Sequence, residues 1–206
     1  MHTYRCHPSL RSSRLGPVIG AHSVHLHQSD IDGACGAHCV LMALMILGVL
    51  KRSATRDLAH ARGQARSLWR IAERRYFIGT GTRDLKSMAA PFRQDVTVKS
   101  FRKNMVTKAL AVLDESGVAI IGISNESFSH WVLAIGTGGS ETGSKNQPVR
   151  FLILDPGHPT IPLASWNATL SIKSDMLDRH VYETADGRTL VEVCGLVTLG
   201  KVRTSP

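Results

Sequence analysis

Three residues that lie far apart in the sequence have the side chains needed for covalent acyl transfer. Cys35 begins an apolar run that favours a helix, His130 begins an apolar strand, and Asp155 ends a later one. The unpaired backbone N–H groups and the positive dipole end at the start of a helix favour a thiolate at such a cysteine. If the two strands are antiparallel neighbours, His130 and Asp155 lie side by side at one end of the sheet. The thiolate could then attack a carbonyl, while the imidazole moves the proton and the carboxylate orients the ring.

A fourth residue could stabilise the negative charge that forms on the attacked carbonyl oxygen. Gln28 stands seven residues before Cys35. Its side-chain amide, together with the backbone N–H of Cys35, could donate hydrogen bonds to this oxyanion. Small residues, Gly33, Ala34 and Gly36, surround the cysteine and leave room for a substrate carbonyl to approach.

The first half of the sequence favours helices. Residues 35–50 are apolar almost all round and rich in helix formers, which predicts a central buried helix. Residues 56–76 have apolar side chains at three- and four-residue spacing, which predicts an amphipathic helix, and shorter helices are expected over 82–89 and 104–115. The other face of the amphipathic helix carries an arginine at every fourth position, and these four residues are called the arginine row: Arg62, Arg66, Arg70 and Arg74.

The second half of the sequence favours strands. Four segments rich in β-branched and apolar residues are separated by Gly, Asn, Ser and Pro, and they cover 118–124, 130–136, 149–155 and 189–199. Helices followed by a meandering antiparallel sheet predict an α+β fold, with two lobes packed around a cleft.

Three segments resemble the papain-like cysteine peptidases, and in particular the branch that processes bacteriocin leader peptides. They are QSDIDGACGAHCVLMAL (28–44), SHWVLAIG (129–136) and FLILDPG (151–157). The resemblance covers roughly residues 28–160 and depends on the order Gln, Cys, His, Asp. It implies a papain-like α+β fold, with a helical lobe around the central buried helix, an antiparallel sheet lobe and an active-site cleft between them.

The resemblance also implies a role for each matched residue. By position, Gln28 is the oxyanion donor, Cys35 the nucleophile, His130 the base and Asp155 the residue that orients the base. The sequence departs from the branch in a Gln-to-Cys spacing that is one residue longer and in Ala34, where the branch often has Asp. No membrane segment or ATPase follows, so a free-standing relative is expected, and such relatives include bacterial effectors and toxins.

Three functions follow as hypotheses. The first is a cysteine protease that cleaves protein substrates through an acyl-thioester, without a metal or an organic cofactor. The second is a glutamine deamidase, because the same triad can attack a side-chain amide. The third is a non-enzymatic binder of nucleic acid or acidic protein through residues 56–76. The expected partners are a protein substrate, an inhibitor or immunity protein, and an acidic or nucleic-acid-bound target for the arginine row; no membrane partner is expected.

Composition and charge distribution limit these hypotheses. The chain has 206 residues and a net charge of +9, and residues 51–110 hold 15 Lys and Arg against 4 Asp and Glu. Such a basic block attracts nucleic acid or acidic protein surfaces. The longest apolar run, residues 40–50, is shorter than the roughly 20 residues that a membrane-spanning helix needs. Residues 1–27 lack periodicity and predict a flexible arm ahead of one domain over 28–206.

The number and spacing of the cysteines indicate the compartment in which the protein is made. Four scattered cysteines are too few for a disulfide scaffold, which fits synthesis in a reducing compartment, the cytoplasm. No secretory signal peptide is expected, and delivery into another cell is the behaviour of the effector and toxin relatives. Cys39 is expected to belong to the core, and Cys6 and Cys194 are expected to be inert.

Overall fold

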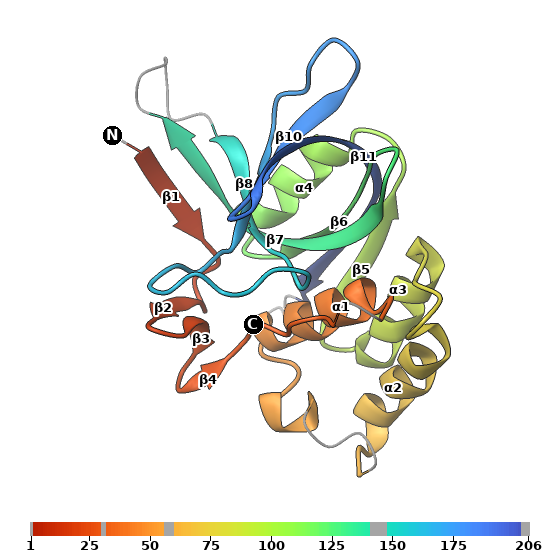
Figure 1. The fold of residues 1–206 in the computed structure, drawn as a ribbon. Coiled ribbons are helices and arrows are strands. Elements are labelled where there is room, and N and C mark those ends of the chain that lie inside the picture. Colours follow the sequence, from red (N-terminus) through yellow and green to blue (C-terminus); the bar gives the residue numbers. More distant parts are fainter. Residues whose placement is uncertain (1, 30–31, 56–59, 141–147, 203–206) are drawn as a thin grey trace.

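Six antiparallel strands in the second half of the chain close into a barrel. The computed structural model describes residues 2–29, 32–55, 60–140 and 148–202. The barrel strands follow the order β7, β6, β11, β10, β9, β8, and β8 pairs with β7 to close the ring (Figure 1). Their bounds are β6 (Val118–Ser124), β7 (Ser129–Ser140), β8 (Pro148–Leu154), β9 (Ala168–Ser171), β10 (Arg179–Thr184) and β11 (Gly187–Lys201).

Five more strands lie outside the ring. β1 (His2–Cys6) pairs with the far half of β7, and β5 (Val96–Phe101) pairs with β11. A separate three-stranded sheet is formed by β2 (Arg11–Ser13), β3 (Gly16–Ile19) and β4 (His22–Ser23).

Four α-helices occur in the described residues. They are α1 (Cys35–Ile46), α2 (Gly63–Arg75), α3 (Thr82–Ala89) and α4 (Met105–Asp114), and two short 3₁₀ turns, η1 (Arg52–Thr55) and η2 (Ala90–Phe92), accompany them. α1, α2 and α3 lie together on one side of the barrel (Figure 1). None of the helices in the described part of the chain has the length and hydropathy needed to cross a bilayer.

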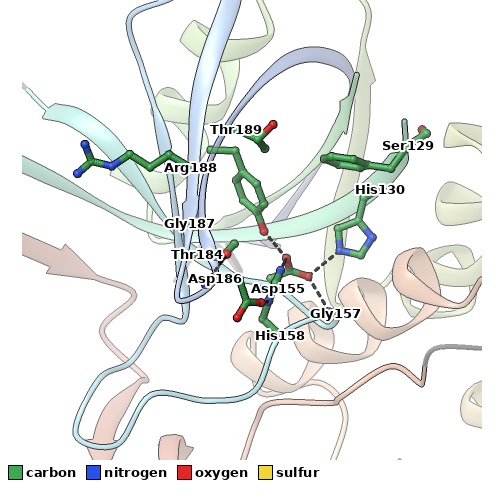
Figure 2. Close-up of a pocket in the computed structure, with 12 residues that line it drawn as sticks. Ser129, His130, Asp155, Gly157, His158, Thr184, Asp186, Gly187, Arg188 and Thr189 are labelled. Carbon is green, nitrogen blue, oxygen red and sulfur yellow. Dashed lines mark hydrogen bonds and ion pairs between the residues drawn. The ribbon is translucent and has the colours of Figure 1, made fainter. Parts of the chain in front are cut away.

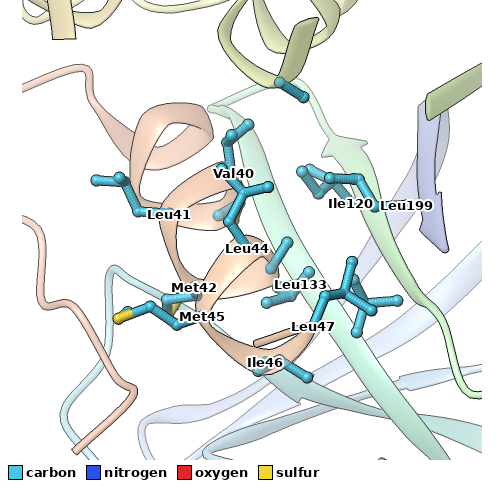
Figure 3. Close-up of a cluster of buried hydrophobic side chains, with 14 of the residues drawn as sticks. Val40, Leu41, Met42, Leu44, Met45, Ile46, Leu47, Ile120, Leu133 and Leu199 are labelled. Atoms are coloured by element: carbon cyan, nitrogen blue, oxygen red, sulfur yellow. The ribbon is translucent and has the colours of Figure 1, made fainter. Parts of the chain in front are cut away.

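Two hydrophobic clusters hold the barrel and the helices together. The first surrounds α1, of which all residues except His38 are buried, and includes Ile120 and Leu133 from the barrel (Figure 3). The second takes alternate residues from all six barrel strands, such as Ile121 and Val132, and adds two residues of α4. Because strand side chains alternate between faces, the second cluster fills the barrel interior and the first packs outside it. α1 is therefore a buried helix fixed against the outer face of β6 and β7.

The papain-like α+β fold implied by the resemblance is wrong. The protein is mostly β, with a closed six-stranded barrel and four short helices in the described residues, in place of a helical lobe and a sheet lobe with a cleft between them. The sequence pattern identified four barrel strands but missed β9 and β10. These two strands connect β8 to β11 and so convert an open sheet into a closed ring.

Two helix boundaries also differ from prediction. The central helix ends at Ile46 instead of residue 50, and Gly48, with a φ of 73°, follows in a left-handed conformation that a right-handed helix cannot continue. The amphipathic helix predicted over 56–76 begins at Gly63, whose φ of 57° likewise prevents helix before it. Residues 56–59 lie outside the described residues. The shorter helices over 82–89 and 104–115 are confirmed within one residue.

The N-terminal segment forms structure where a flexible arm was expected. Residues 2–23 contain β1 to β4, and β1 makes a five-residue antiparallel ladder with β7. Leu10 and Val24 are buried in the cluster around α1. The mixed composition of this segment hid the strands because they are short and because all except β3 lie at the edges of sheets, where apolar alternation is weak.

Candidate active site

The structure brings His130 and Asp155 together as the strand pattern predicted. β7 and β8 are antiparallel neighbours, with Leu133 opposite Leu154, so the start of one strand meets the end of the other. The Nε2 atom of His130 lies 2.6 Å from Oδ1 of Asp155 (Figure 2). A bond this short between an imidazole and a carboxylate is typical of a charge-assisted pair. The catalytic roles of both residues stay predictions.

Asp155 is a buried carboxylate held on both of its oxygens. It is 1% exposed, and its Oδ1 also accepts a hydrogen bond of 2.7 Å from the backbone N–H of Gly157. The hydroxyl of Tyr182, on β10, donates to Oδ2. Burial alone would raise the pKa of Asp155, but its bonds with His130, Tyr182 and Gly157 outweigh burial and lower that pKa. Asp155 is therefore a stable carboxylate at neutral pH.

Asn167 fixes the backbone around Asp155. Its Oδ1 accepts a hydrogen bond of 2.7 Å from the Asp155 N–H, and its Nδ2 donates 2.8 Å bonds to the carbonyl oxygens of Asp155 and His158. Its side chain is 2% exposed. Asn167 thus closes the turn that follows β8 and sets the direction in which the Asp155 carboxylate points. Neither Asn167 nor Tyr182 belongs to a motif that sequence reasoning could have recognised.

Cys35 is the first residue of α1 and interacts with the imidazole of His130. Its side chain is 8% exposed, and no acidic residue occupies the first turn of α1. Burial alone would lower the pKa of His130, but hydrogen bonds with Asp155 and Cys35 and the charges of both raise that pKa to about 10. His130 therefore favours the imidazolium form between a carboxylate and a sulfur. The three residues predicted to form a triad therefore lie close together, with His130 hydrogen-bonded to Asp155 and electrostatically coupled to Cys35.

A second contact positions Cys35 relative to His130. The indole N–H of Trp131, the neighbour of His130, donates a 2.8 Å hydrogen bond to the carbonyl oxygen of Thr80. Thr80 in turn packs against Gly36, the neighbour of Cys35, so closely that an added Cβ would lie 2.0 Å from the Thr80 Oγ1. Only glycine fits there. Trp131 and Thr80 therefore link the strand that carries the base to the helix that carries the sulfur.

Gln28 lies between the turn after Asp155 and the loop before Cys35. Its backbone N–H donates a 2.7 Å bond to the carbonyl oxygen of Pro156, and its Nε2 donates a 2.6 Å bond to the carbonyl oxygen of Asp32. An amide NH₂ group carries two hydrogens, so one N–H is anchored and the second can still be donated. This arrangement is compatible with the predicted oxyanion role.

Asp32 organises the loop that leads into α1, and sequence reasoning missed it. Its carboxylate accepts hydrogen bonds from the backbone N–H of Ser29 at 2.9 Å, the Ser29 hydroxyl at 2.7 Å, the N–H of Ala34 at 3.0 Å and the Tyr76 hydroxyl at 3.3 Å. Burial raises the pKa of Asp32, but these hydrogen bonds outweigh it and lower that pKa. Through its carbonyl oxygen the same residue holds Gln28. Asp32 therefore sets both the backbone before the nucleophile and the amide of the predicted oxyanion donor.

We expect Asp32→Asn to destabilise the protein by about 1–3 kcal/mol and to lower turnover. Whichever oxygen is replaced, the new NH₂ group faces another hydrogen-bond donor. Urea unfolding measures the first effect, and kcat per folded molecule measures the second. Asp175→Asn is the matched control, because Asp175 caps the loop between β9 and β10 in a similar way through the N–H groups of Leu177 and Arg179. Equal effects of the two substitutions on kcat would contradict a positioning role for Asp32.

The other cysteines lie where a nucleophile is not expected. Cys39 is fully buried, its thiol contacts the carbonyl oxygen of Trp131 at 3.3 Å, and burial raises its pKa well above the ordinary value. Its expected place in the core is confirmed. Burial likewise raises the pKa of Cys6 to about 11, and Cys194 is exposed on β11.

A cavity of about 470 Å³ opens beside His130. Its walls come from the ends of two hairpins, β6–β7 and β10–β11, and from the turn after β8 (Figure 2). The lining combines hydroxyl, charged and aromatic side chains: Phe128, Ser129, His130, Asp155, Gly157, His158, Tyr182, Thr184, Asp186, Gly187, Arg188 and Thr189. Two of the charged groups are already paired, Asp186 with His158 at 3.1 Å and Arg188 with Glu183 at 2.9 Å.

The arginine row is exposed along α2. Arg66, Arg70 and Arg74 lie within the helix as predicted, whereas Arg62 stands at the N-cap position, just outside the helix that was predicted to contain it. Their side chains have no ion pair or hydrogen bond within residues 2–29, 32–55, 60–140 and 148–202. The row is not part of the Cys35 cluster.

A comparison with known proteins found no matching family model and no matching curated relative. The function is therefore argued from the chemistry of the site.

Proposed function

We propose that the protein is a cysteine hydrolase that cleaves peptide bonds through an acyl-thioester on Cys35. The observation that carries the proposal is the position of His130, held at 2.6 Å by a buried carboxylate, with a cysteine at a helix N-terminus near enough to contribute to the raised pKa of its imidazole. A nucleophile, a base and a group that orients the base are the three parts that acyl transfer needs. The proposal rests on these contacts and not on the barrel, because a fold does not determine a function.

In the first half of the reaction, the Cys35 thiol gives its proton to His130 and the sulfur attacks the substrate carbonyl carbon. The negative oxygen that results accepts hydrogen bonds from the Cys35 backbone N–H and from the second amide hydrogen of Gln28. The imidazolium of His130 then protonates the leaving nitrogen, and the C–N bond breaks. An acyl-thioester and a free amine are left.

In the second half, His130 takes a proton from a water molecule, and the hydroxide oxygen attacks the thioester carbon. The same donors stabilise the second oxyanion. The C–S bond breaks, the proton returns to the sulfur, and a free carboxylic acid leaves. Asp155 stays ionised throughout and keeps the imidazole in the orientation that both proton transfers require.

The cavity beside His130 favours peptide cleavage over glutamine deamidation. The leaving nitrogen must lie within reach of the imidazolium, so the group attached to it must occupy the space next to His130. Deamidation releases only ammonia, whereas peptide cleavage releases a chain with side chains. The cavity lies on the side of His130 where Asp155 and Tyr182 line it and Cys35 does not, and its volume of about 470 Å³ falls in the range of ligand-binding cavities.

Mass spectrometry of a proteome-derived peptide library, treated with wild-type protein or with Cys35→Ser, tests the proposal. We expect new chain termini that depend on Cys35. Intact peptides in which glutamine has become glutamate would instead show a deamidase. The absence of both products, together with alkylation of Cys35 no faster than that of exposed Cys194, would rule out a hydrolase.

A further inference from the structure

The arginine row ends at the loop that carries the nucleophile. α2 runs from Gly63 to Arg75, and the next residue, Tyr76, accepts a 2.6 Å hydrogen bond from the backbone N–H of Gly33 through its carbonyl oxygen. The Tyr76 hydroxyl also donates to Asp32. Because these contacts lie two and three residues before Cys35, the C-terminal end of α2 adjoins the site. Arg74 is the member of the row nearest to it, and Arg62 is the farthest.

Two exposed apolar side chains lie between the row and the site. Phe77 is 73% exposed and Ile78 is 72% exposed, directly after α2. Their backbone packs on the loop before the nucleophile, since a Cβ added to Gly33 would lie 3.3 Å from the carbonyl carbon of Phe77. Large side chains at this level of exposure commonly mark a surface that a partner covers.

The guanidinium groups of the arginine row are not paired with acidic side chains in the part of the chain that the structure describes. Arg75, the next arginine on α2, is paired with Asp84 at 3.1 Å, whereas the four members of the row have no partner in the described residues. The block 51–110, with 15 basic and 4 acidic residues, adds to the positive field around them. The complementary ligand is an anion with several charges.

The spacing of the row fits an extended peptide. Residues four apart on a helix rise by about 6.0 Å, and alternate residues of an extended strand are about 6.6–6.8 Å apart. Over the two helical steps from Arg66 to Arg74 the two repeats differ by roughly 1–2 Å, and the row turns by about 80° around the helix axis; long arginine side chains can bend toward one extended peptide across these differences. The distance from Arg66 to Arg74, about 12 Å along the helix axis, corresponds to roughly four residues of extended peptide, and Arg62 stands just before the helix, at its N-cap position.

We propose that the substrate is a peptide with an acidic segment that binds along the arginine row. Glutamate or aspartate side chains at alternate positions pair with the four guanidinium groups, an apolar residue follows at Phe77 and Ile78, and the scissile carbonyl then reaches Cys35. This inference rests on the proposed function, because it places the acidic segment and the cleaved bond in one chain. A peptide is favoured over nucleic acid because the row leads to a site for carbonyl chemistry, and because Trp69, the aromatic residue between Arg66 and Arg70, packs against the core instead of offering a free ring for base stacking.

Fluorescence anisotropy with the full chain carrying Cys35→Ser measures the docking step without catalysis. The probe is a fluorescein-labelled dodecapeptide of alternating Glu and Ser, compared with its Gln–Ser counterpart and with a labelled twelve-nucleotide oligo-dT. The variant combines Arg62→Gln, Arg66→Gln, Arg70→Gln and Arg74→Gln. A control with the same change in net charge combines substitutions of exposed basic residues outside α2: Arg93→Gln, Lys99→Gln, Arg102→Gln and Lys103→Gln.

We expect the Glu–Ser peptide to bind about tenfold more weakly to the row variant, as four exposed ion pairs would give, and less than twofold more weakly to the control. Added NaCl should weaken binding to the parent protein, and the Gln–Ser peptide should not bind. Equal losses in both variants would overturn the proposal, because net charge alone would explain them. Tighter binding of oligo-dT, lost in the row variant, would overturn it in favour of a nucleic-acid surface.

The outcome is separable from that of the proposed function. If the row variant unfolds, Arg66→Glu and Arg70→Glu are measured singly, each with an expected loss of at least twofold, and no loss in either overturns the proposal. Selective peptide binding without any Cys35-dependent cleavage would contradict the hydrolase and leave a binding surface. Cleavage by the wild type, without selective binding to the row, would contradict only the acidic segment.

Discussion

Cys35→Ala abolishes hydrolysis, with an expected fall in kcat/KM of roughly 10⁴-fold or more, as for the loss of a catalytic nucleophile elsewhere. In the proposed mechanism the sulfur forms the covalent intermediate, and no other described residue near His130 offers a comparable nucleophile. The side chain that is lost is small and lies at the edge of the site, 8% exposed, so the fold should survive. Thermal unfolding followed by circular dichroism separates loss of activity from loss of structure.

Cys39→Ala is the matched control, with the same substitution one turn further along α1. Cys39 is fully buried in the cluster around α1, so its truncation should cost stability through a small void while kcat of the folded protein stays within twofold. Retention of full activity by Cys35→Ala, or an equal loss of activity in both variants, would contradict the assignment of Cys35 as the nucleophile.

Alkylation by iodoacetamide gives an independent measurement of the same cysteine. If His130 holds the proton of Cys35, the Cys35 peptide should be labelled below neutral pH, faster than the peptides of Cys39 and Cys194. His130→Ala should abolish that difference. Labelling of Cys35 that does not depend on His130 would indicate a thiol that is merely accessible.

The sequence predicted the placement of His130 beside Asp155 better than it predicted the fold. Strand ends are marked locally, by Pro156 and Gly157 after Asp155 and by the polar segment before His130, so the two functional side chains could be placed at one edge of a sheet. The pairing of β7 with β8 then brought them together. Local sequence signals were enough to place His130 and Asp155, because placing each of them required only that the end of its own strand be recognised.

Barrel closure could not be predicted because β10 has an inverted pattern. His180 and Tyr182 are 6% and 4% exposed and point inward, whereas the apolar Val181 between them is 40% exposed. A strand with polar residues inside and an apolar residue outside does not show the alternation that identifies a half-buried strand. Tyr182 is inward because its hydroxyl binds Asp155, a contact between residues far apart in the sequence.

The pH dependence of stability follows from the raised pKa of His130 and the lowered pKa of Asp155. A raised pKa contributes stability that is complete below the ordinary histidine value and is lost as pH rises through the folded value of about 10. For Asp155 the sign is opposite: its contribution is complete above the ordinary aspartate value and is lost as pH falls through its lowered folded value. Stability from the pair is therefore greatest in mildly acidic solution.

Asp155→Asn tests what the carboxylate charge does, because the amide can keep most of the geometry. The Asn oxygen can accept from Gly157 and His130, and its NH₂ group can donate to the Tyr182 oxygen, so the side chain stays in place while its charge is lost. The pKa of His130 then falls toward its ordinary value. We expect kcat to fall by roughly 10²-fold to 10⁴-fold, since a comparable substitution in another triad costs about 10⁴.

The pH profile of kcat/KM separates this role from simple structural support. In the wild type the alkaline limb should report loss of the His130 proton, and in Asp155→Asn that limb should move to lower pH. Tyr182→Phe is the matched control: it removes one donor to Asp155 but leaves the carboxylate on His130, so kcat should fall less than tenfold and the limb should move little. An alkaline limb that stays in place in Asp155→Asn would mean that another group holds the proton on His130, because the charge that keeps the imidazolium in the folded protein would then not be that of Asp155.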